Sequence, residues 1–436
     1  RDEDSRADRS PGEFYQLDFE MSFVTQEDIF KALEPVLYEV FNENNNFNKL
    51  KPWKVHNYPF PRIPYAESLE KYGTDKPDLR NPLFIEDYTE IFSNSNFKIF
   101  ADQILKDSIV KGIKVKNTAN KPRSFFDKMN DWSRSEGAAG LGYINLINKE
   151  FKGPIAKNLS DEQLSKINLQ ENESVFFICD KLKMAQLFAG KVRTKLAVQR
   201  APIVRYVTAN FLQDRYPTEG KVFVASNVEL TDNYMLHAER TPPNAKRRVV
   251  FGTIGSLNTR LKGIHSAIEA LRILRQRRPS LTFEYRVLGE GHFDGVLEDQ
   301  ESDLIKFEGT LPGGKPILDW LEGIDIYLQP SFQEGLPRSL IEALSRGCIC
   351  VGSTAGGIPE LLGPERLHTP GNPQELADKI DAVLREDEKN LIGEIKQNLT
   401  IASRYTSDRL MAVRVQSLQA LRDLTHRSEG KNTDES

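Results

Sequence analysis

The chain has 436 residues, 39% of them hydrophobic and 28% charged, and 59 basic against 63 acidic side chains give a formal net charge of −4. This length predicts two or three domains with buried cores, and the charge excludes a basic surface spread over the whole chain for nucleic acid. Three cysteines exclude a disulfide framework and favour a reducing compartment, for which we predict the cytoplasm. We expect no membrane span, because no apolar run approaches ~20 residues, and no signal peptide.

The choice of basic residue changes along the chain. The first 200 residues contain 21 Lys and 9 Arg, whereas residues 201–436 contain 9 Lys and 20 Arg. Because the two side chains carry the same charge, neither fold nor solubility demands this change. Composition leaves two explanations open: two domains that simply differ, or two halves of different origin.

The first half has mixed local patterns. Residues 13–24 alternate apolar and polar side chains, which predicts a half-buried strand, and residues 26–41 have the apolar spacing of a helix. Short strands are expected at 97–100, 109–115, 141–146 and 174–178, separated by helical segments. This half therefore belongs to the α+β class.

Several segments of the first half resemble bacterial-type aspartyl-tRNA synthetase, a class II aminoacyl-tRNA ligase. Arg1–Arg9, followed by Glu13-Phe14, is similar to the second signature motif of that family. Tyr72–Arg80 is similar to a segment close to unique to the family, and Gly153–Lys157 resembles part of the domain inserted in the bacterial enzymes. The resemblance implies a catalytic-core fragment over residues 1–81 and an inserted α+β domain over residues 82–197.

The same resemblance implies roles for three residues of the motif. Arg1 would hold the α-phosphate of ATP, Glu3 would hold ATP from the strand edge, and Phe14 would stack on the adenine, with ATP and Mg²⁺ as the cofactors. A fixed guanidinium suits the charge that builds up during adenylate formation. Without the resemblance, this stretch is a solvated charged loop. Ser10 and Gly12 depart from the family pattern.

Other parts of the synthetase family have no counterpart in the sequence. The chain starts at Arg1, inside the motif, so we expect the anticodon-binding barrel, the first motif and the aspartate-binding residues to be missing. Nothing after about residue 197 resembles the third motif. We therefore expect neither ligase activity nor tRNA binding.

The second half repeats strand, loop and helix. Strands are expected at 248–255, 281–288, 304–307, 324–328 and 348–351, and helices at 264–278, 316–321, 337–346 and 373–385. This order predicts an α/β fold, a Rossmann-like doubly wound parallel sheet. Ligands of such sheets bind beyond the carboxyl ends of the strands.

Three loops follow strands of this sheet and could meet at that edge. Gly255–Gly263 contains Lys262 and opens a helix, an arrangement that favours phosphate, although alone it is better read as a surface loop. Glu334 and Glu342 lie eight residues apart and can point into one cleft, where carboxylates accept hydrogen bonds from hydroxyl groups. Gly356–Glu360 could line the same cleft. A glutamate on a helix is normally solvated, but the convergence of three loops favours a site.

Together these features resemble glycosyltransferase family 4, retaining sugar-nucleotide transferases of the GT-B fold. The resemblance implies that residues 201–426 form a nucleotide-sugar-binding domain that needs no metal. Lys262 would neutralise the donor diphosphate, Glu334 would touch the donor sugar, and Glu342 would hold the ribose hydroxyls. The other implied binding positions are Gly255, Gly263, Gly289, Gly291, Leu336, Gly356 and Gly357. Ser256 departs from the family pattern, in which many members have an arginine.

The transferase family also uses a separate N-terminal acceptor domain, which we expect to be missing before residue 201. The last helix, expected at 407–424, would then expose an apolar face, and residues 427–436 would form a disordered tail. Three hypotheses remain open for the chain: nucleotide-sugar binding by the second half, a tRNA ligase function of the first half, and a non-catalytic fusion of two fragments. The Lys-to-Arg change coincides with the change of resemblance, which favours separate origins.

Overall fold

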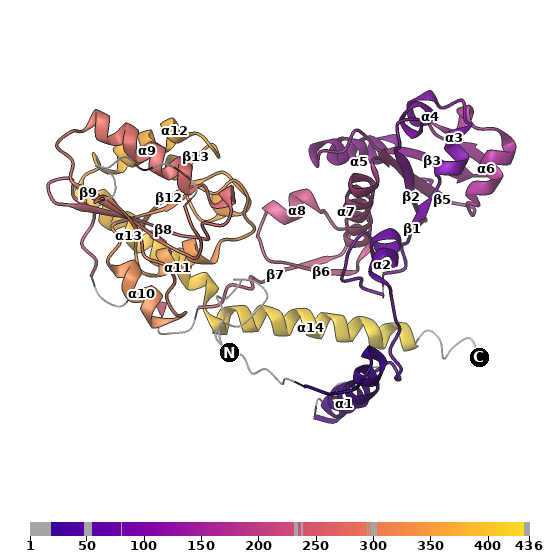
Figure 1. The fold of residues 1–436 in the computed structure, drawn as a ribbon, viewed down its shortest axis with the longest axis horizontal. Helices are drawn as coiled ribbons and strands as arrows, with labels where there is room; N and C mark the ends of the chain where they lie inside the picture. The colour runs from indigo at the N-terminus through magenta and orange to yellow at the C-terminus, as the bar shows by residue number, and fades with distance from the viewer. Residues whose placement is uncertain are drawn as a thin grey trace. The chain divides into compact units, whose positions relative to one another are not determined.

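The computed structural model describes residues 19–430, apart from 48–54, 80, 231–233, 237–238, 294, 296 and 298–302. Contacts within the chain divide it into two compact units, of which the first spans Leu17–Arg200 and the second contains Ala201–Ser436 (Figure 1). Each unit has its own sheet and its own buried core.

The first unit is built on a five-stranded antiparallel sheet with the order β1-β2-β5-β3-β4. Its strands are β1 (Ile85–Asp87), β2 (Ile109–Lys116), β3 (Gly142–Ile147), β4 (Glu150–Lys152) and β5 (Glu173–Asp180). The helices are α1 (Gln26–Phe47), α2 (Tyr65–Tyr72), α3 (Thr89–Ser93), α4 (Lys98–Ile104), α5 (Arg123–Ser135), α6 (Asp161–Ile167) and α7 (Leu182–Arg200). The α+β class predicted for this half is confirmed.

Both faces of this sheet are buried, because helices cover each of them (Figure 1). On β5, Phe176 and Ile178 pack with α5 and α7, whereas Val175 and Phe177 pack with α3, α4 and α6. All four side chains are at most 3% exposed. A strand buried on both faces reads as a continuous apolar run rather than as an alternating one.

Two of the strands predicted for this unit are not found in the described residues. Residues 97–100 begin helix α4, because Phe97, Phe100 and Ala101 have the i, i+3, i+4 spacing that places three side chains on one helix face. Residues 19–24 form no strand, since Phe19 and Met21 are exposed and no described strand lies beside them to bury the alternating side chains. The rest of the predicted strand, residues 13–18, lies outside the described residues.

The second unit contains a six-stranded, fully parallel sheet with the order β10-β9-β8-β11-β12-β13. Its strands are β8 (Val249–Ile254), β9 (Phe283–Leu288), β10 (Ile305–Phe307), β11 (Ile326–Gln329), β12 (Ile349–Ser353) and β13 (Leu367–His368). A separate two-stranded parallel sheet is formed by β6 (Ile203–Tyr206) and β7 (Lys221–Val224). The helices are α8 (Phe211–Arg215), α9 (Ile264–Arg277), α10 (Lys315–Glu322), α11 (Arg338–Ser345), α12 (Pro373–Val383), α13 (Glu388–Ala402) and α14 (Ser407–Gly430). The predicted doubly wound α/β fold is confirmed.

Helices cover both faces of the parallel sheet. Helices α9 and α12 lie on one face and α10 and α11 on the other (Figure 1), and each pair buries an apolar cluster against the strands. Helix α14 continues to Gly430, past the point at which the sequence predicts a disordered tail, because no proline or glycine interrupts it before that residue. On α14 the side chains of Met411, Val415 and Leu418 are exposed, as the sequence suggests for its apolar face.

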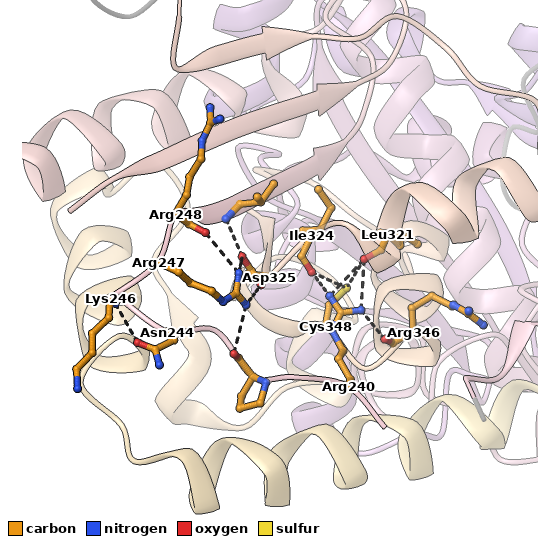
Figure 2. A network of polar contacts seen from close by, with 12 residues as sticks. Arg240, Asn244, Lys246, Arg247, Arg248, Leu321, Ile324, Asp325, Arg346 and Cys348 are labelled. Atoms are coloured by element: carbon orange, nitrogen blue, oxygen red, sulfur yellow. Dashed lines mark hydrogen bonds and ion pairs between the residues drawn. The ribbon is translucent and has the colours of Figure 1, made fainter. Parts of the chain in front are cut away.

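The segment that leads into β8 is fastened at the amino ends of the strands by Arg240 (Figure 2). The Arg240 guanidinium donates to the carbonyl oxygen of Arg346 at 2.7 Å, to that of Leu321 at 3.3 and 3.4 Å, and to that of Ile324. The Cys348 thiol lies against two of the same carbonyls. Leu321 and Arg346 lie at the carboxyl ends of α10 and α11, where the regular backbone bonding provides few donors, so Arg240 adds hydrogen bonds at both places.

Asp325, the residue after Ile324, fastens the same segment just before β11 (Figure 2). Its carboxylate accepts two hydrogen bonds from Arg247, at 2.5 and 3.0 Å, and a third from the backbone N–H of Val250 at 2.9 Å. The Asp325 backbone N–H in turn donates to the Val250 carbonyl at 2.8 Å. The paired bonds set the register between β8 and β11, the two central strands.

One glycine decides how closely the loop after β8 approaches β11. Gly263 lies between a 3₁₀ turn (Arg260–Lys262) and α9, with φ at +69°, and a Cβ there would overlap the carbonyl oxygen of Pro330. Only glycine combines this left-handed backbone with so close an approach.

Gly263→Ala is therefore expected to lower the free energy of unfolding of the second unit by at least about 2 kcal/mol, from the left-handed backbone and the overlap together. Gly393→Ala in α13 is the matched control, because nothing lies within 4 Å of its Cβ position. That change should instead stabilise by roughly 0.5–1 kcal/mol, since alanine is favoured over glycine inside a helix. Denaturant unfolding followed by circular dichroism measures both, and a Gly263→Ala chain as stable as the wild type would contradict the expectation.

Candidate functional site

The candidate site lies at the carboxyl ends of the parallel strands, where the loops after β8, β9, β11 and β12 are joined by backbone hydrogen bonds. Leu257 N–H donates to the Glu290 carbonyl at 2.7 Å, and Phe332 N–H donates to the Leu261 carbonyl at 2.8 Å. The Gly357 N–H, in the loop after β12, donates to the Gly335 carbonyl in the loop after β11 at 2.7 Å. The loops singled out in the sequence are thus brought together.

Lys262 and Glu334 form the central contact of this site. Lys262 Nζ lies 2.7 Å from Glu334 Oε1, although 72 residues separate the two in the sequence. The Lys262 side chain is 31% exposed and that of Glu334 is 9% exposed. The pair therefore places an ammonium that solvent or a ligand can reach above a carboxylate that is nearly buried.

Glu334 also rests on polar side chains that the sequence analysis assigned no role. The Ser331 hydroxyl donates to Glu334 Oε1 at 2.8 Å, and Gln329 Nε2 donates to the same oxygen at 3.1 Å. The signal for them is a glutamine at the end of a strand whose other side chains are apolar and buried. Polar groups in such a place require partners.

Glu342 lies in helix α11 and is almost fully buried. Its Oε1 accepts a hydrogen bond from Arg338 Nε at 2.9 Å, one helical turn earlier. Burial raises the pKa of Glu342, and the Arg338 guanidinium offsets part of that effect. The sequence prediction that Glu334 and Glu342 share one cleft remains a prediction, since the two carboxylates have different hydrogen-bond partners.

The glycines predicted for the site all lie where loops meet closely. Gly356 has φ at +59°, and a Cβ there would overlap the carbonyl oxygen of Glu334. At four more of the predicted positions an added Cβ would come closer than 3.0 Å to an atom of a neighbouring residue: Gly255, Gly289, Gly291 and Gly357. Leu336, the remaining predicted binding residue, is partly buried and packs on the apolar cluster beneath α11. These residues shape the loops, and whether they touch a ligand stays a prediction.

Glu360, which the sequence grouped with the same cleft, has a structural role instead. Its carboxylate accepts hydrogen bonds from the backbone N–H groups of Ala209, Asn210 and Phe211, at 2.6, 2.9 and 2.7 Å. Three such bonds satisfy the orphan donors at the start of α8 and hold the carboxylate in place. Glu360 therefore ties residues 209–211 to the second unit.

The residues predicted to bind ATP, Arg1, Glu3 and Phe14, lie outside the described residues. The described part of the synthetase-like region includes Tyr72–Leu79, and Arg193 of α7 contacts the chain at the end of this segment and just beyond it. The guanidinium of Arg193, buried to 5% exposure, donates to the carbonyl oxygen of Leu83 at 2.6 Å and to those of Asp78 and Asn81 at 3.5 and 3.4 Å. Such contacts fix the backbone of this segment and assign it no chemistry.

A cavity of about 380 Å³ lies away from the candidate site, at the opposite end of the strands, because its lining includes Ser280 and Leu281 just before β9 and Ala245 just before β8. Its three arginines are paired, Arg277 with Asp378 at 2.7 Å and Arg278 and Arg385 with Asp381. Cations here complement the carboxyl ends of α9 and α12, so the cavity needs no ligand to explain its charge.

Among the described residues, no group of three or more His, Cys, Asp or Glu side chains could hold a metal ion. Within the same residues, none of the helices combines the length and apolarity that crossing a membrane requires.

Residues 1–219, just over half of the chain, match the family model described as tRNA synthetases class II (D, K and N). The chain belongs to this family. Residues 248–386 match a second model, Glycosyl transferases group 1. The chain thus joins a class II synthetase segment to a glycosyl transferase segment, as the two resemblances in the sequence indicated.

The synthetase segment is similar to aspartate–tRNA(Asp/Asn) ligases. The protein of Rickettsia bellii is 57% identical over 202 residues, which cover 45% of this chain and 33% of the relative. That of Paramagnetospirillum magneticum is 54% identical over 200 residues, or 45% of this chain and 22% of the relative. The chain therefore spans a third or less of the length of these curated relatives.

Solved structures similar to the chain are glycosyltransferases and related enzymes. Anabaena Alr3699/HepE, crystallised in complex with UDP and glucose, is 23% identical with a TM-score of 0.40, covering 53% of this chain and 66% of that one. Sucrose-phosphate synthase from Thermosynechococcus elongatus is 16% identical with a TM-score of 0.40, covering 55% and 62%.

The synthetase match runs past Arg200 into β6 and α8, whereas the first compact unit ends at Arg200. The bonds from Ala209, Asn210 and Phe211 to Glu360 attach this stretch to the second unit. The structural boundary therefore lies before β6.

The raised pKa of Glu342 has a consequence for stability. A native carboxyl with a pKa above its unfolded value, about 4.3, binds more protons than the unfolded chain between the two values. The free energy of unfolding should therefore fall as pH rises through that window. Glu342→Gln removes this titration, so the wild type should gain stability relative to the variant as pH is lowered from 7 towards about 4.5. Urea unfolding at a series of pH values measures the difference, and the opposite slope would contradict it.

Proposed function

We propose that the second unit binds a nucleoside diphosphate sugar at the carboxyl edge of its parallel sheet and serves as the donor domain of a glycosyltransferase. The observation that carries this proposal is the Lys262–Glu334 pair, an accessible ammonium and a nearly buried carboxylate brought to one strand end. The match to Glycosyl transferases group 1 supports the same reaction class.

In this proposal the two charges serve two parts of one ligand. A diphosphate near Lys262 would be held by a charge-assisted hydrogen bond and by the nearby start of α9. Glu334 would accept hydrogen bonds from hydroxyls of the donor sugar, and Glu342 from those of the ribose. Both carboxylates are acceptor-only groups, which suits ligands rich in hydroxyls. We also propose a cytoplasmic location, which rests on the three free cysteines.

Isothermal calorimetry of the full chain with UDP-, GDP- and ADP-glucose tests the proposal. At least one of the three is expected to bind, and Lys262→Ala should weaken its binding about 10- to 100-fold, the range for a hydrogen bond to a charged group. Lys315→Ala is the matched control, because this exposed lysine pairs only with Asp319 inside α10 among the described residues. No heat with any of the three donors would overturn the proposal.

A second candidate is the ligase reaction of the synthetase family, favoured by the 57% identity of the first segment to an aspartate–tRNA(Asp/Asn) ligase. ATP, Mg²⁺ and tRNA would be its ligands, with Arg1, Glu3 and Phe14 at the nucleotide. We expect no aspartate-dependent ATP–pyrophosphate exchange, because the chain spans a third or less of the relatives. Exchange above background that is lost in Arg1→Ala would establish the ligase function instead.

A third candidate is a non-catalytic fusion of two fragments, produced by gene rearrangement, by an assembly error or by design. The Lys-to-Arg change near residue 200 and the two separate family matches favour separate origins. Sequencing of the source DNA across codons 190–205 in independent isolates distinguishes a natural gene from an error, since one uninterrupted frame in all of them would count against an error.

A further inference from the structure

A polar side chain beneath the candidate site has no part in the roles assigned so far. Gln329 is the last residue of β11, at the centre of the parallel sheet, and is only 1% exposed. A buried amide needs partners for its two N–H groups and its oxygen. Gln329 meets four side chains: Tyr327, Ser331, Glu334 and Ser339.

The chemistry of two of these partners fixes which end of the amide faces which neighbour. A carboxylate only accepts, so Nε2 of Gln329 must face Glu334, at 3.1 Å. The Tyr327 hydroxyl already accepts from the backbone N–H of Ile254 at 3.2 Å, which leaves its proton for Gln329 Oε1 at 3.3 Å. Burial raises the pKa of Tyr327, so the phenol keeps that proton. The amide is thus locked against rotation.

The oriented amide and its neighbours hold one oxygen of Glu334, Oε1. Oε1 receives three donors, from Lys262 at 2.7 Å, Ser331 at 2.8 Å and Gln329 at 3.1 Å, while none of the described residues donates to Oε2. Ser331 accepts from Gln329 Nε2 at 2.9 Å, so its own proton is directed to Glu334. One carboxylate oxygen is thus held by three donors, and the other receives no hydrogen bond from the described residues.

The three donors differ in how firmly they are held. Lys262 is 31% exposed and has a flexible stem, whereas Gln329 and Ser331 are 1% and 0% exposed. If a diphosphate takes the Lys262 ammonium, as proposed above, the two buried donors alone keep the carboxylate in position. Without Gln329, a lone serine hydroxyl would do so.

We propose that Gln329 is the positioning residue of the donor-sugar site: it holds Glu334 through Oε1 so that Oε2 faces the sugar hydroxyls while Lys262 turns to the diphosphate. This inference rests on the proposed nucleotide-sugar function for its ligand, but the position of the Glu334 carboxylate can be tested without one.

The test uses Gln329→Leu in the full chain, with Ser339→Ala as the control. Ser339 donates to Gln329 Oε1 at 3.2 Å but has no bond to Glu334, so its loss perturbs the network and spares the carboxylate. Calorimetry is carried out with the nucleoside diphosphate and with its sugar derivative. Gln329→Leu should weaken binding of the sugar derivative about tenfold and leave that of the diphosphate within about twofold, because only the sugar contact depends on Glu334. A merely structural defect would weaken both ligands alike.

Crystal structures of the two unliganded variants provide the second readout. The Glu334 carboxylate is expected to rotate in Gln329→Leu and to stay in place in Ser339→Ala. An unmoved carboxylate in Gln329→Leu, or equal losses for both ligands, would overturn the positioning role. A wild-type chain that binds neither ligand would overturn the proposed function, and the crystal structures would still decide the role of Gln329.

Discussion

The candidate site of the second unit centres on one ion pair, between Lys262 and Glu334. The lysine comes from the loop after β8 and the glutamate from the loop after β11, so their contact requires both strands to be neighbours in the same direction. The Arg247–Asp325 contact at the other end of these strands keeps their register, and Gly263 lets the lysine loop close over Pro330. The order of the strands, the Arg247–Asp325 contact and the glycine at position 263 thus all help to bring the two opposite charges together.

Much of this architecture could be predicted because the spacing of apolar residues along the chain indicates the strands and helices. The strand–helix repeat gave the parallel sheet, and with it the edge at which Lys262, Glu334 and the glycines meet. The strand predicted at residues 97–100 is wrong because four residues are too few to distinguish a buried strand from the first turn of a helix. Gln329 was not recognised because a polar residue closing an apolar strand looks like the first residue of a loop, and only its four partners show that it is buried. Glu360 shows the reverse case, a carboxylate in a promising loop that backbone N–H groups have already taken.

The two family matches and the change from lysine to arginine divide the chain at nearly the same place. Lysine predominates up to residue 200 and arginine after it, and the compact units separate at the same residue. The synthetase match nevertheless reaches residue 219, into elements that Glu360 binds to the second unit. Sequence similarity therefore places the junction near residue 219, whereas packing places it at residue 200. Packing is the physical criterion that decides which unit stabilises the residues in between.

Among the described residues, each of the four buried apolar clusters draws its members from one unit alone, two from the first and two from the second. A crossover between genes at residue 200 would therefore cut the polypeptide without dividing any core. In evolutionary terms such a breakpoint is permissive, because each buried apolar cluster would keep all of its own residues on one side of the exchange.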